Sequence, residues 1–213
     1  MIKNRIELVD KLSENIAQYS PVVIQGDDGV GKSFFLEMLC EKLIANNTIK
    51  NYLIQSSWEY QKNLIKAIED YKTHKFIDSY LSFDLIAIDD IQCLAERVTT
   101  TQEELLHIFK TFKKPIIITT NCAIEDCSFR DDFVQFLSEG TSITLNRPSK
   151  QDVLDMLIRH IGDAGIILTV EAIEWLKTQS VDTISKSKGI FKKIKLYSDK
   201  KNIDLNEIKE ILN

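Results

Sequence analysis

Proline and glycine are scarce in this sequence, with three prolines and seven glycines among 213 residues. Both residues concentrate in turns and irregular segments, so their scarcity indicates that most of the chain forms helices and strands. Hydrophobic residues make up 44% of the chain and charged residues 28%. These are the proportions of an ordinary globular protein, and they exclude a disordered or collagen-like chain.

Long apolar runs are also absent. No segment approaches the roughly 18 consecutive apolar residues that a membrane-spanning helix needs, and the N-terminal residues do not form the hydrophobic run of a targeting segment. We therefore expect a soluble, cytoplasmic protein without a membrane partner. The net charge of −5 argues against a protein whose entire surface binds nucleic acid through positive charge. It does not exclude a local basic face.

Cysteine is rare as well, and the four cysteines have no metal-type spacing: Cys40, Cys93, Cys122 and Cys127. The last two are five residues apart, with neither a second pair nor a nearby histidine to complete a metal site. We expect four free thiols, as is usual in the cytosol, and keep metal or redox chemistry as the alternative.

Strand-like and helix-like segments alternate over the first two thirds of the chain. Apolar segments of strand length occupy residues 21–25, 51–54, 83–88, 115–120 and 142–145. Helical spacing of apolar side chains occurs in residues 2–16, 33–45, 58–71 and 101–112. This alternation predicts βαβ units, and hence an α/β fold in which helices flank a mostly parallel sheet.

The pattern changes after residue 147. Helical spacing continues, without a strand signal, in residues 149–161, 169–179, 185–200 and 205–212. Ser149 and Thr169 precede two of these segments, where N-cap residues are expected. We therefore expect an α/β core over residues 1–147 and a small, all-helical part over residues 148–213.

The strongest motif is Gly26-Asp27-Asp28-Gly29-Val30-Gly31-Lys32-Ser33, a full match to G-x-x-x-x-G-K-[ST] between a predicted strand and a predicted helix. Glycines at these positions let backbone N–H groups surround a phosphate at a helix N-terminus. In such a loop Lys32 reaches the outer phosphates and the Ser33 hydroxyl binds Mg²⁺. Because Asp27 and Asp28 repel phosphate, their side chains are expected to point outward. A chance glycine-rich turn is the alternative.

Polar residues follow two other predicted strands. Asp89 and Asp90 end the apolar segment that begins at Phe83. Asp89 is placed to hold Mg²⁺, directly or through water, and Asp90 to orient the attacking water. Asn121 directly follows the segment 115–120. There it would lie between the two earlier strand ends, and it would sense the γ-phosphate or position water. The alternatives are an acidic strand end on the surface and an ordinary turn residue.

The order of these motifs resembles the AAA+ ATPases, specifically the DnaA/Hda family. The residues that carry the resemblance are the P-loop at 26–33, the segment IDDIQCLA at 88–95 and the segment TQEELLHIF at 101–109. The resemblance implies a helical lid that closes over ATP or ADP bound with Mg²⁺. It also implies that the replication initiator DnaA or another AAA+ replication protein is a partner, with a second copy of this chain as a further candidate.

The sequence departs from this family at two arginine positions. Phe136 aligns with the arginine that reaches into the neighbouring subunit's site, and Arg130 is the only arginine nearby and is out of register. This leaves hydrolysis of the usual self-assembled kind in doubt, with weak ATPase activity as the expectation. Lys188 aligns near the family's lid arginine, so it either contacts nucleotide as a point charge or is exposed to solvent.

Charge is unevenly distributed, with a net −6 over residues 1–149 and +1 over residues 150–213. Seven lysines cluster near the end, with Phe191 and Tyr197 interleaved: Lys186, Lys188, Lys192, Lys193, Lys195, Lys200 and Lys201. The cluster is either a contact for DNA phosphate or for an acidic partner, or the solvated side of a helix whose core face is Ile190, Ile194 and Leu196.

The family's C-terminal domain that reads origin DNA has no counterpart among these 213 residues. Together with the resemblance, this favours an Hda-like regulator of DnaA that acts in the control of chromosomal replication initiation. The alternatives are a nucleotide-dependent adaptor similar to helicase loaders, with little hydrolysis of its own, and a truncated DnaA-like initiator that binds DNA.

Overall fold

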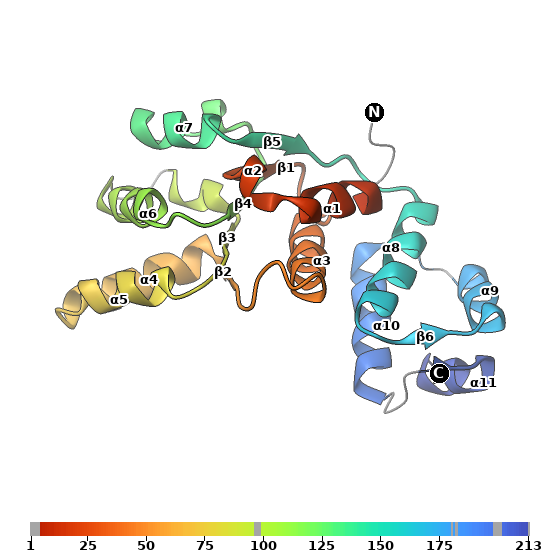
Figure 1. The fold of residues 1–213 in the computed structure, drawn as a ribbon. Helices are drawn as coiled ribbons and strands as arrows, with labels where there is room; N and C mark the ends of the chain where they lie inside the picture. The colour runs from red at the N-terminus through yellow and green to blue at the C-terminus, as the bar shows by residue number, and fades with distance from the viewer. Residues whose placement is uncertain (1–4, 96–98, 180, 182, 198–201, 213) are drawn as a thin grey trace.

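A parallel β-sheet with helices on both faces forms the larger part of the structure, which is a computed structural model that describes residues 5–95, 99–179, 181, 183–197 and 202–212 (Figure 1). The sheet order is β2-β3-β4-β1-β5, and every neighbouring pair is parallel. The strands are β1 (Val22–Gln25), β2 (Leu53–Ser56), β3 (Ile86–Asp89), β4 (Ile116–Thr120) and β5 (Thr141–Thr144). This architecture confirms the predicted α/β class.

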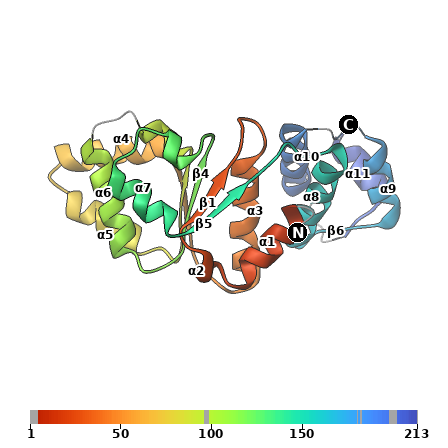
Figure 2. The same ribbon diagram turned by 90° about the horizontal axis from the view of Figure 1, so that it is seen from above.

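Helices cover the two faces of the sheet as two separate groups (Figure 2). Successive strand residues supply both cores, since Val22 and Ile24 pack on one face and Val23 on the other. One face carries α1 (Arg5–Glu14) and α3 (Lys32–Ala45), with α2 (Ile16–Tyr19) joining α1 to β1. The other face carries α4 (Ser57–Glu69), α5 (Thr73–Leu81), α6 (Thr99–Thr111) and α7 (Asp131–Ser138).

The C-terminal residues pack against α1 and α3 and extend the same hydrophobic core. They form the helices α8 (Lys150–Asp163), α9 (Val170–Thr178), α10 (Ile184–Tyr197) and α11 (Leu205–Leu212). Ser149 and Thr169 cap α8 and α9 as predicted, since each side chain accepts a backbone N–H of the first turn. None of the described helices is long and apolar enough to cross a membrane.

Two details of the C-terminal part differ from the predictions. A parallel pair, β6 (Ile167–Leu168) with β7 (Asn202–Ile203), lies among the helices, so this part is not helical throughout. Two-residue strands are too short to give a sequence signal. The core face of α10 also differs, because Phe191 and Ile194 are buried whereas Leu196 is 73% exposed. Of the clustered lysines, Lys200 and Lys201 lie outside the described residues.

Two tyrosines on α4 and α5 offer a test of the packing on that face. Tyr60 is fully buried, and its hydroxyl has no partner among the described residues, whereas the Tyr80 hydroxyl donates to Gln55 Oε1. A buried hydroxyl without a partner costs free energy, and a bonded one stabilises. We expect Tyr60→Phe to raise the free energy of unfolding by about 1 kcal/mol and Tyr80→Phe to lower it by about 1 kcal/mol. Urea denaturation measures both, and equal losses in the two variants would contradict the prediction.

Candidate nucleotide site

The loop between β1 and α3 has the backbone conformation that its glycines allow. Gly29 and Gly31 have φ angles of 78° and 91°, in the left-handed region that residues with a Cβ rarely adopt. Gly31 is the residue that precedes α3, so the unpaired N–H groups of the first helical turn begin directly after the loop. Backbone donors and the positive end of a 14-residue helix therefore meet at this loop, which is an arrangement suited to phosphate.

Lys32 is buried inside this loop. Its Nζ donates to the carbonyl oxygen of Gly26 at 2.8 Å and to that of Asp27 at 3.3 Å, and only 6% of the residue is exposed. A phosphate oxygen is a charged and therefore stronger acceptor than these carbonyl groups. Asp27 and Asp28 are exposed, as expected, although a carboxylate oxygen of Asp28 is 3.7 Å from Lys32 Nζ.

The sheet order brings the other predicted residues to the same edge. Strand β4 lies between β1 and β3, so Asn121 follows a strand whose two neighbours end at the P-loop and at Asp89. Asn121 Nδ2 is 3.3 Å from Asp28 Oδ1, a hydrogen bond that joins the end of β4 to the P-loop. Asn121 therefore follows the strand that lies between β1 and β3, while its role as a nucleotide sensor stays a prediction.

Thr119 is a polar residue of this edge that the sequence analysis missed. Its hydroxyl donates to Asp89 Oδ1 and accepts the backbone N–H of Asp90 at 2.9 Å, and the residue is fully buried. A single hydroxyl therefore orients both acidic residues. The sequence contains one signal that could have indicated this residue, the pair of threonines at the end of an otherwise apolar strand. Both hydroxyl groups are buried, which is unusual for threonine.

Asp90 adopts a left-handed conformation, with φ 55°, that is uncommon for a residue with a side chain. Its carbonyl oxygen accepts the Ser57 hydroxyl at 2.6 Å, and its carboxylate accepts Gln92 Nε2 at 3.2 Å. Gln92 belongs to the short helix η1 (Ile91–Leu94). Strained backbone held by such contacts is characteristic of functional sites.

The donor atoms present suit magnesium better than a transition metal. Ser33 offers a hydroxyl oxygen at the start of α3, and Asp89 offers a carboxylate at the end of β3. Mg²⁺ prefers oxygen ligands and is usually held by one or two carboxylates together with substrate phosphates. Among the described residues, no group of three or more His, Cys, Asp or Glu side chains could hold a metal on its own.

Lys188 lies on α10 but reaches the helix that follows the P-loop. Its Nζ is 2.9 Å from Glu37 Oε2 and 5.6 Å from the centre of the Phe34 ring, and both of these residues belong to α3. The ammonium is paired with a carboxylate and half-buried, so the alternative of simple solvent exposure is wrong. A contact between Lys188 and nucleotide stays a prediction.

The position expected for an inter-subunit arginine is a partly buried phenylalanine that packs against the core. Phe136 of α7 packs against Phe109 of α6, with ring centroids 5.9 Å apart. Arg130 precedes α7, and its guanidinium pairs with Glu103 and Asp132. The hydrogen bond from Arg130 lowers the pKa of the Asp132 carboxyl. The one arginine in this region is therefore held within its own chain.

The cysteines differ from the prediction of four free thiols. Cys122 and Cys127 form a disulfide, because the short helix η2 (Ile124–Asp126) turns the chain back and brings their Cα atoms to 6.8 Å. Cys40 and Cys93 are free. Cys40 is buried, and desolvation followed by the charges of Glu41 and Glu37 raises the pKa of its thiol to about 12. Cys40 is therefore a core residue and not a reactive thiol.

Comparison with known sequences identifies one family. The sequence profile described as the bacterial DnaA ATPase domain matches residues 4–144. Among curated relatives, the chromosomal replication initiator protein DnaA of Buchnera aphidicola subsp. Cinara cedri is 26% identical over an alignment of 210 positions, which covers 95% of this chain and 48% of that protein. DnaA of Chlorobaculum tepidum is 27% identical over 212 residues, with coverages of 94% and 43%. The chain thus spans about half the length of these relatives.

Solved structures share the fold. Domain III of the Thermotoga maritima replication initiation protein DnaA superposes with a TM-score of 0.66 at 22% identity, covering 96% of this chain and 88% of that one. AMPPCP-bound DnaA from Aquifex aeolicus gives 0.62 at 22% identity, with coverages of 91% and 60%. The DnaC helicase loader gives 0.55 at 19% identity, with coverages of 67% and 89%.

Proposed function

The chain belongs to the bacterial DnaA ATPase domain family, and on this basis we propose that it binds ATP or ADP with Mg²⁺ and controls replication initiation through the bound nucleotide. One observation carries the proposal. The sheet order gathers the phosphate-binding loop, the Asp89 carboxylate and Asn121 at a single edge, and hydrogen bonds already connect them through Asp28 and Thr119. In this arrangement Lys32 and the loop amides hold the phosphates.

Each residue then has a role that its contacts support. Ser33 and Asp89 would hold Mg²⁺, which would neutralise the charge of the phosphates. Thr119 keeps the Asp89 carboxylate in place through its hydroxyl. Asp90, anchored by Ser57 and Gln92, orients water. Asn121 senses the outermost phosphate from the end of β4. Lys188 approaches from α10 when the C-terminal helices close over the nucleotide.

The role in replication that we favour is that of an Hda-like regulator, which presents a nucleotide-dependent surface to a DnaA-type initiator. The curated relatives are replication initiators, and one similar structure is DnaA with bound AMPPCP. In this role the chain would associate with the initiator, a member of its own ATPase family, in a nucleotide-dependent manner. A second copy of the chain is a further candidate partner.

The alternative role, a nucleotide-dependent adaptor with little hydrolysis, is favoured by one observation. Phe136 packs against the core where the family places its inter-subunit arginine, and Arg130 is paired within the chain. Such an arginine contributes about 10³–10⁵ in rate. A chain without a free arginine at this position would bind the partner and the nucleotide without accelerating turnover.

An Arg130→Ala variant separates the two roles. Phosphate release is measured from DnaA of the same organism, with and without this chain. If the chain is a regulator that uses Arg130, it stimulates turnover and the variant loses that stimulation by about 10³-fold. Arg159→Ala, which removes an arginine of α8 that pairs with Asp10 and Asp163, is the matched control and keeps the stimulation. ATP-dependent complex formation without stimulation would instead establish the adaptor.

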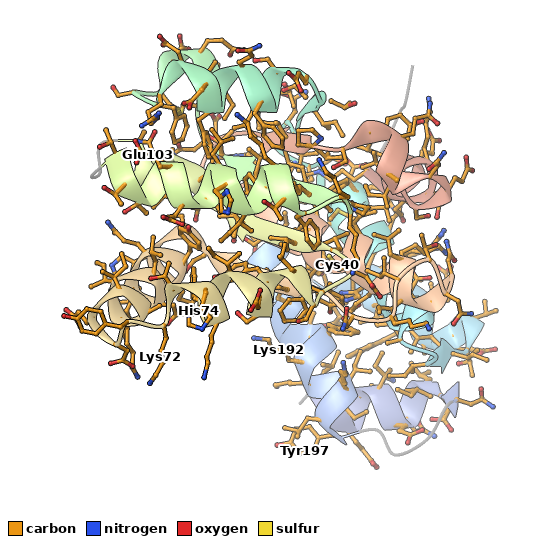
Figure 3. All side chains as sticks on the ribbon, turned by 60° about the vertical axis from the view of Figure 1, so that its left-hand side comes forward. Cys40, Lys72, His74, Glu103, Lys192 and Tyr197 are labelled. Atoms are coloured by element: carbon orange, nitrogen blue, oxygen red, sulfur yellow. A yellow bond between two sulfur atoms is a disulfide. The ribbon has the colours of Figure 1, made fainter. Side chains whose placement is uncertain are left out.

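Binding to DNA is the third role, and it concerns the exposed side of α10. Lys192 and Tyr197 project from this helix (Figure 3), and Lys193 is exposed beside them. Duplex binding that weakens steeply with salt, and that weakens further in the Lys192→Ala/Lys193→Ala double variant, would favour a DNA-binding initiator over both other roles.

A further inference from the structure

Arg5, the first described residue of α1, has one guanidinium nitrogen that lacks a partner. The residue is 8% exposed. Its Nη2 donates to the backbone carbonyl oxygen of Asn146, whereas Nη1 is buried and has no hydrogen-bond partner among the described residues. Buried side-chain donors are nearly always bonded, so an unbonded charged donor needs an explanation.

The unbonded nitrogen lies against the P-loop. A Cβ built on Gly31 would lie 3.4 Å from Arg5 Nη1. The side chain of Ile184, at the start of α10, also packs against this position of Gly31. Gly31 is the N-cap residue of α3, so Nη1 stands beside the helix terminus at which the loop amides gather. In Figure 2, the start of α1 lies next to α8, where the C-terminal helices pack against α1 and α3.

The charges around Arg5 do not account for its position. The N-terminus of α3 carries positive partial charge and repels a guanidinium. The nearby acidic group is Asp152, but its Oδ2 already accepts the Ser149 backbone N–H at 2.9 Å and the Ser149 hydroxyl at 2.7 Å. Burial lowers the pKa of the Arg5 guanidinium, and the charge of Asp152 opposes this shift. The guanidinium nevertheless stays protonated at neutral pH, so a desolvated cation faces a positive helix end.

Space for a ligand group adjoins Arg5. A cavity of about 410 Å³ is lined by residues of α1, of β5, of α8 and of the segment that joins β5 to α8, among them Arg5, Leu8, Leu145, Asn146 and Asp152, but by no residue of the phosphate-binding loop. This volume lies within the ordinary range of small-ligand sites. An anion placed between Nη1 and the loop amides would satisfy the guanidinium and the helix terminus together.

We propose that Arg5 is a nucleotide-binding residue whose Nη1 donates to a phosphate oxygen while Nη2 keeps its bond to the Asn146 carbonyl. The inference rests on the proposed nucleotide function and deepens it. Asn146 belongs to the segment that joins β5 to α8, so one guanidinium ties the phosphate chain to the connection that carries the C-terminal helices. Nucleotide occupancy is thereby coupled to the position of α8.

Four variants of the full chain test this inference by calorimetric titration with MgATP and MgADP. A hydrogen bond to a charged group contributes about 1.5–3 kcal/mol, and 1.4 kcal/mol corresponds to tenfold in affinity. We therefore expect Arg5→Ala and Arg5→Gln to weaken both nucleotides by about tenfold or more. Arg5→Lys keeps the charge and is expected to recover part of the loss. Arg159→Ala is the control, because Arg159 is also an arginine that bridges α1 and α8, but it lies near Asp163 at the far end of α8. This variant is expected to bind both nucleotides as tightly as the unaltered chain does.

Hydrogen exchange provides a second readout. MgATP is expected to protect the amides of α8 in the unaltered chain, and Arg5→Gln is expected to lose this protection even at nucleotide concentrations that fill its site. Equal affinities of Arg5→Gln and the unaltered chain would overturn the inference, as would an Arg5→Lys variant as weak as Arg5→Gln. If the unaltered chain binds no nucleotide, the proposed function itself fails, which is a separate outcome.

Discussion

Replacing Lys32 with alanine is expected to weaken MgATP binding by about 100-fold or more. The Lys32 ammonium is buried in the loop, where its present acceptors are the Gly26 and Asp27 carbonyl oxygens. When phosphate replaces these acceptors, the variant loses at least one charge-assisted hydrogen bond in a desolvated site, and about 2.7 kcal/mol corresponds to a factor of 100. Isothermal titration calorimetry at constant salt measures the change.

Lys42→Ala is the matched control for this variant. Lys42 belongs to the same helix α3, but its Nζ is 3.8 Å from Asp10 and 3.6 Å from Asp163, away from the loop. We expect Lys42→Ala to keep its affinity for MgATP, although it loses two partly buried ion pairs. If Lys32→Ala binds MgATP with an affinity within a factor of about two of that of Lys42→Ala, the loss is far smaller than expected. That result would show that the P-loop assignment is wrong.

Replacing Gly140 with alanine is expected to destabilise the fold by about 3 kcal/mol, the upper end of the effect of overpacking. A Cβ on Gly140 would lie 1.9 Å from the Pro21 carbonyl oxygen and 2.8 Å from the carbonyl carbon. Both contacts are to backbone, which cannot turn away as a flexible side chain can. The same carbonyl oxygen accepts the Thr141 N–H at 2.9 Å where β1 begins to pair with β5. Relief of the clash therefore separates the strand that leads to the P-loop from its neighbour.

Gly189→Ala serves as the control for the glycine substitution. Gly189 lies within α10, and a Cβ built there meets no atom within 4 Å. Glycine within a helix costs about 0.5–1 kcal/mol relative to alanine, so this variant is expected to be more stable by that amount. Urea unfolding gives both values. A Gly140→Ala chain as stable as the unaltered one would mean that the two backbones are farther apart than the structure shows.

The strands and the phosphate-binding loop could be predicted because their signals are local. Apolar segments predicted β1, β3, β4 and β5, with ends shifted by at most three residues (β3 begins at Ile86, where residue 83 was expected), and the loop is a contiguous motif. Strand β2 begins two residues later than predicted, because Asn51 and Tyr52 precede the paired residues. Helix α5 was missed because it begins after Lys72 without a side-chain cap. Helix α7 was not predicted either, although two aspartates open it.

Features that depend on distant residues could not be predicted from spacing. The gathering of Asp89 and Asn121 with the P-loop depends on the sheet order, which places β4 between two strands that are far apart in the sequence. The contacts of the Thr119 hydroxyl and the unbonded Arg5 nitrogen are both consequences of tertiary packing. Leu196 shows that apolar spacing alone does not identify the buried side of a helix. The buried side of α10 includes Phe191 and Ile194, and it leaves the apolar side chain of Leu196 exposed.

The central claim is that a nucleoside triphosphate binds at the loop between β1 and α3, and amide NMR of the intact chain tests it most directly. Addition of millimolar MgATP is expected to shift the amide signals of Gly29, Gly31, Lys32 and Ser33, and to leave those of α11 in place. In Lys32→Ala, the same shifts are expected to need about 100-fold more MgATP. Unchanged loop signals in the unaltered chain, or shifts confined to other elements, would contradict the claim.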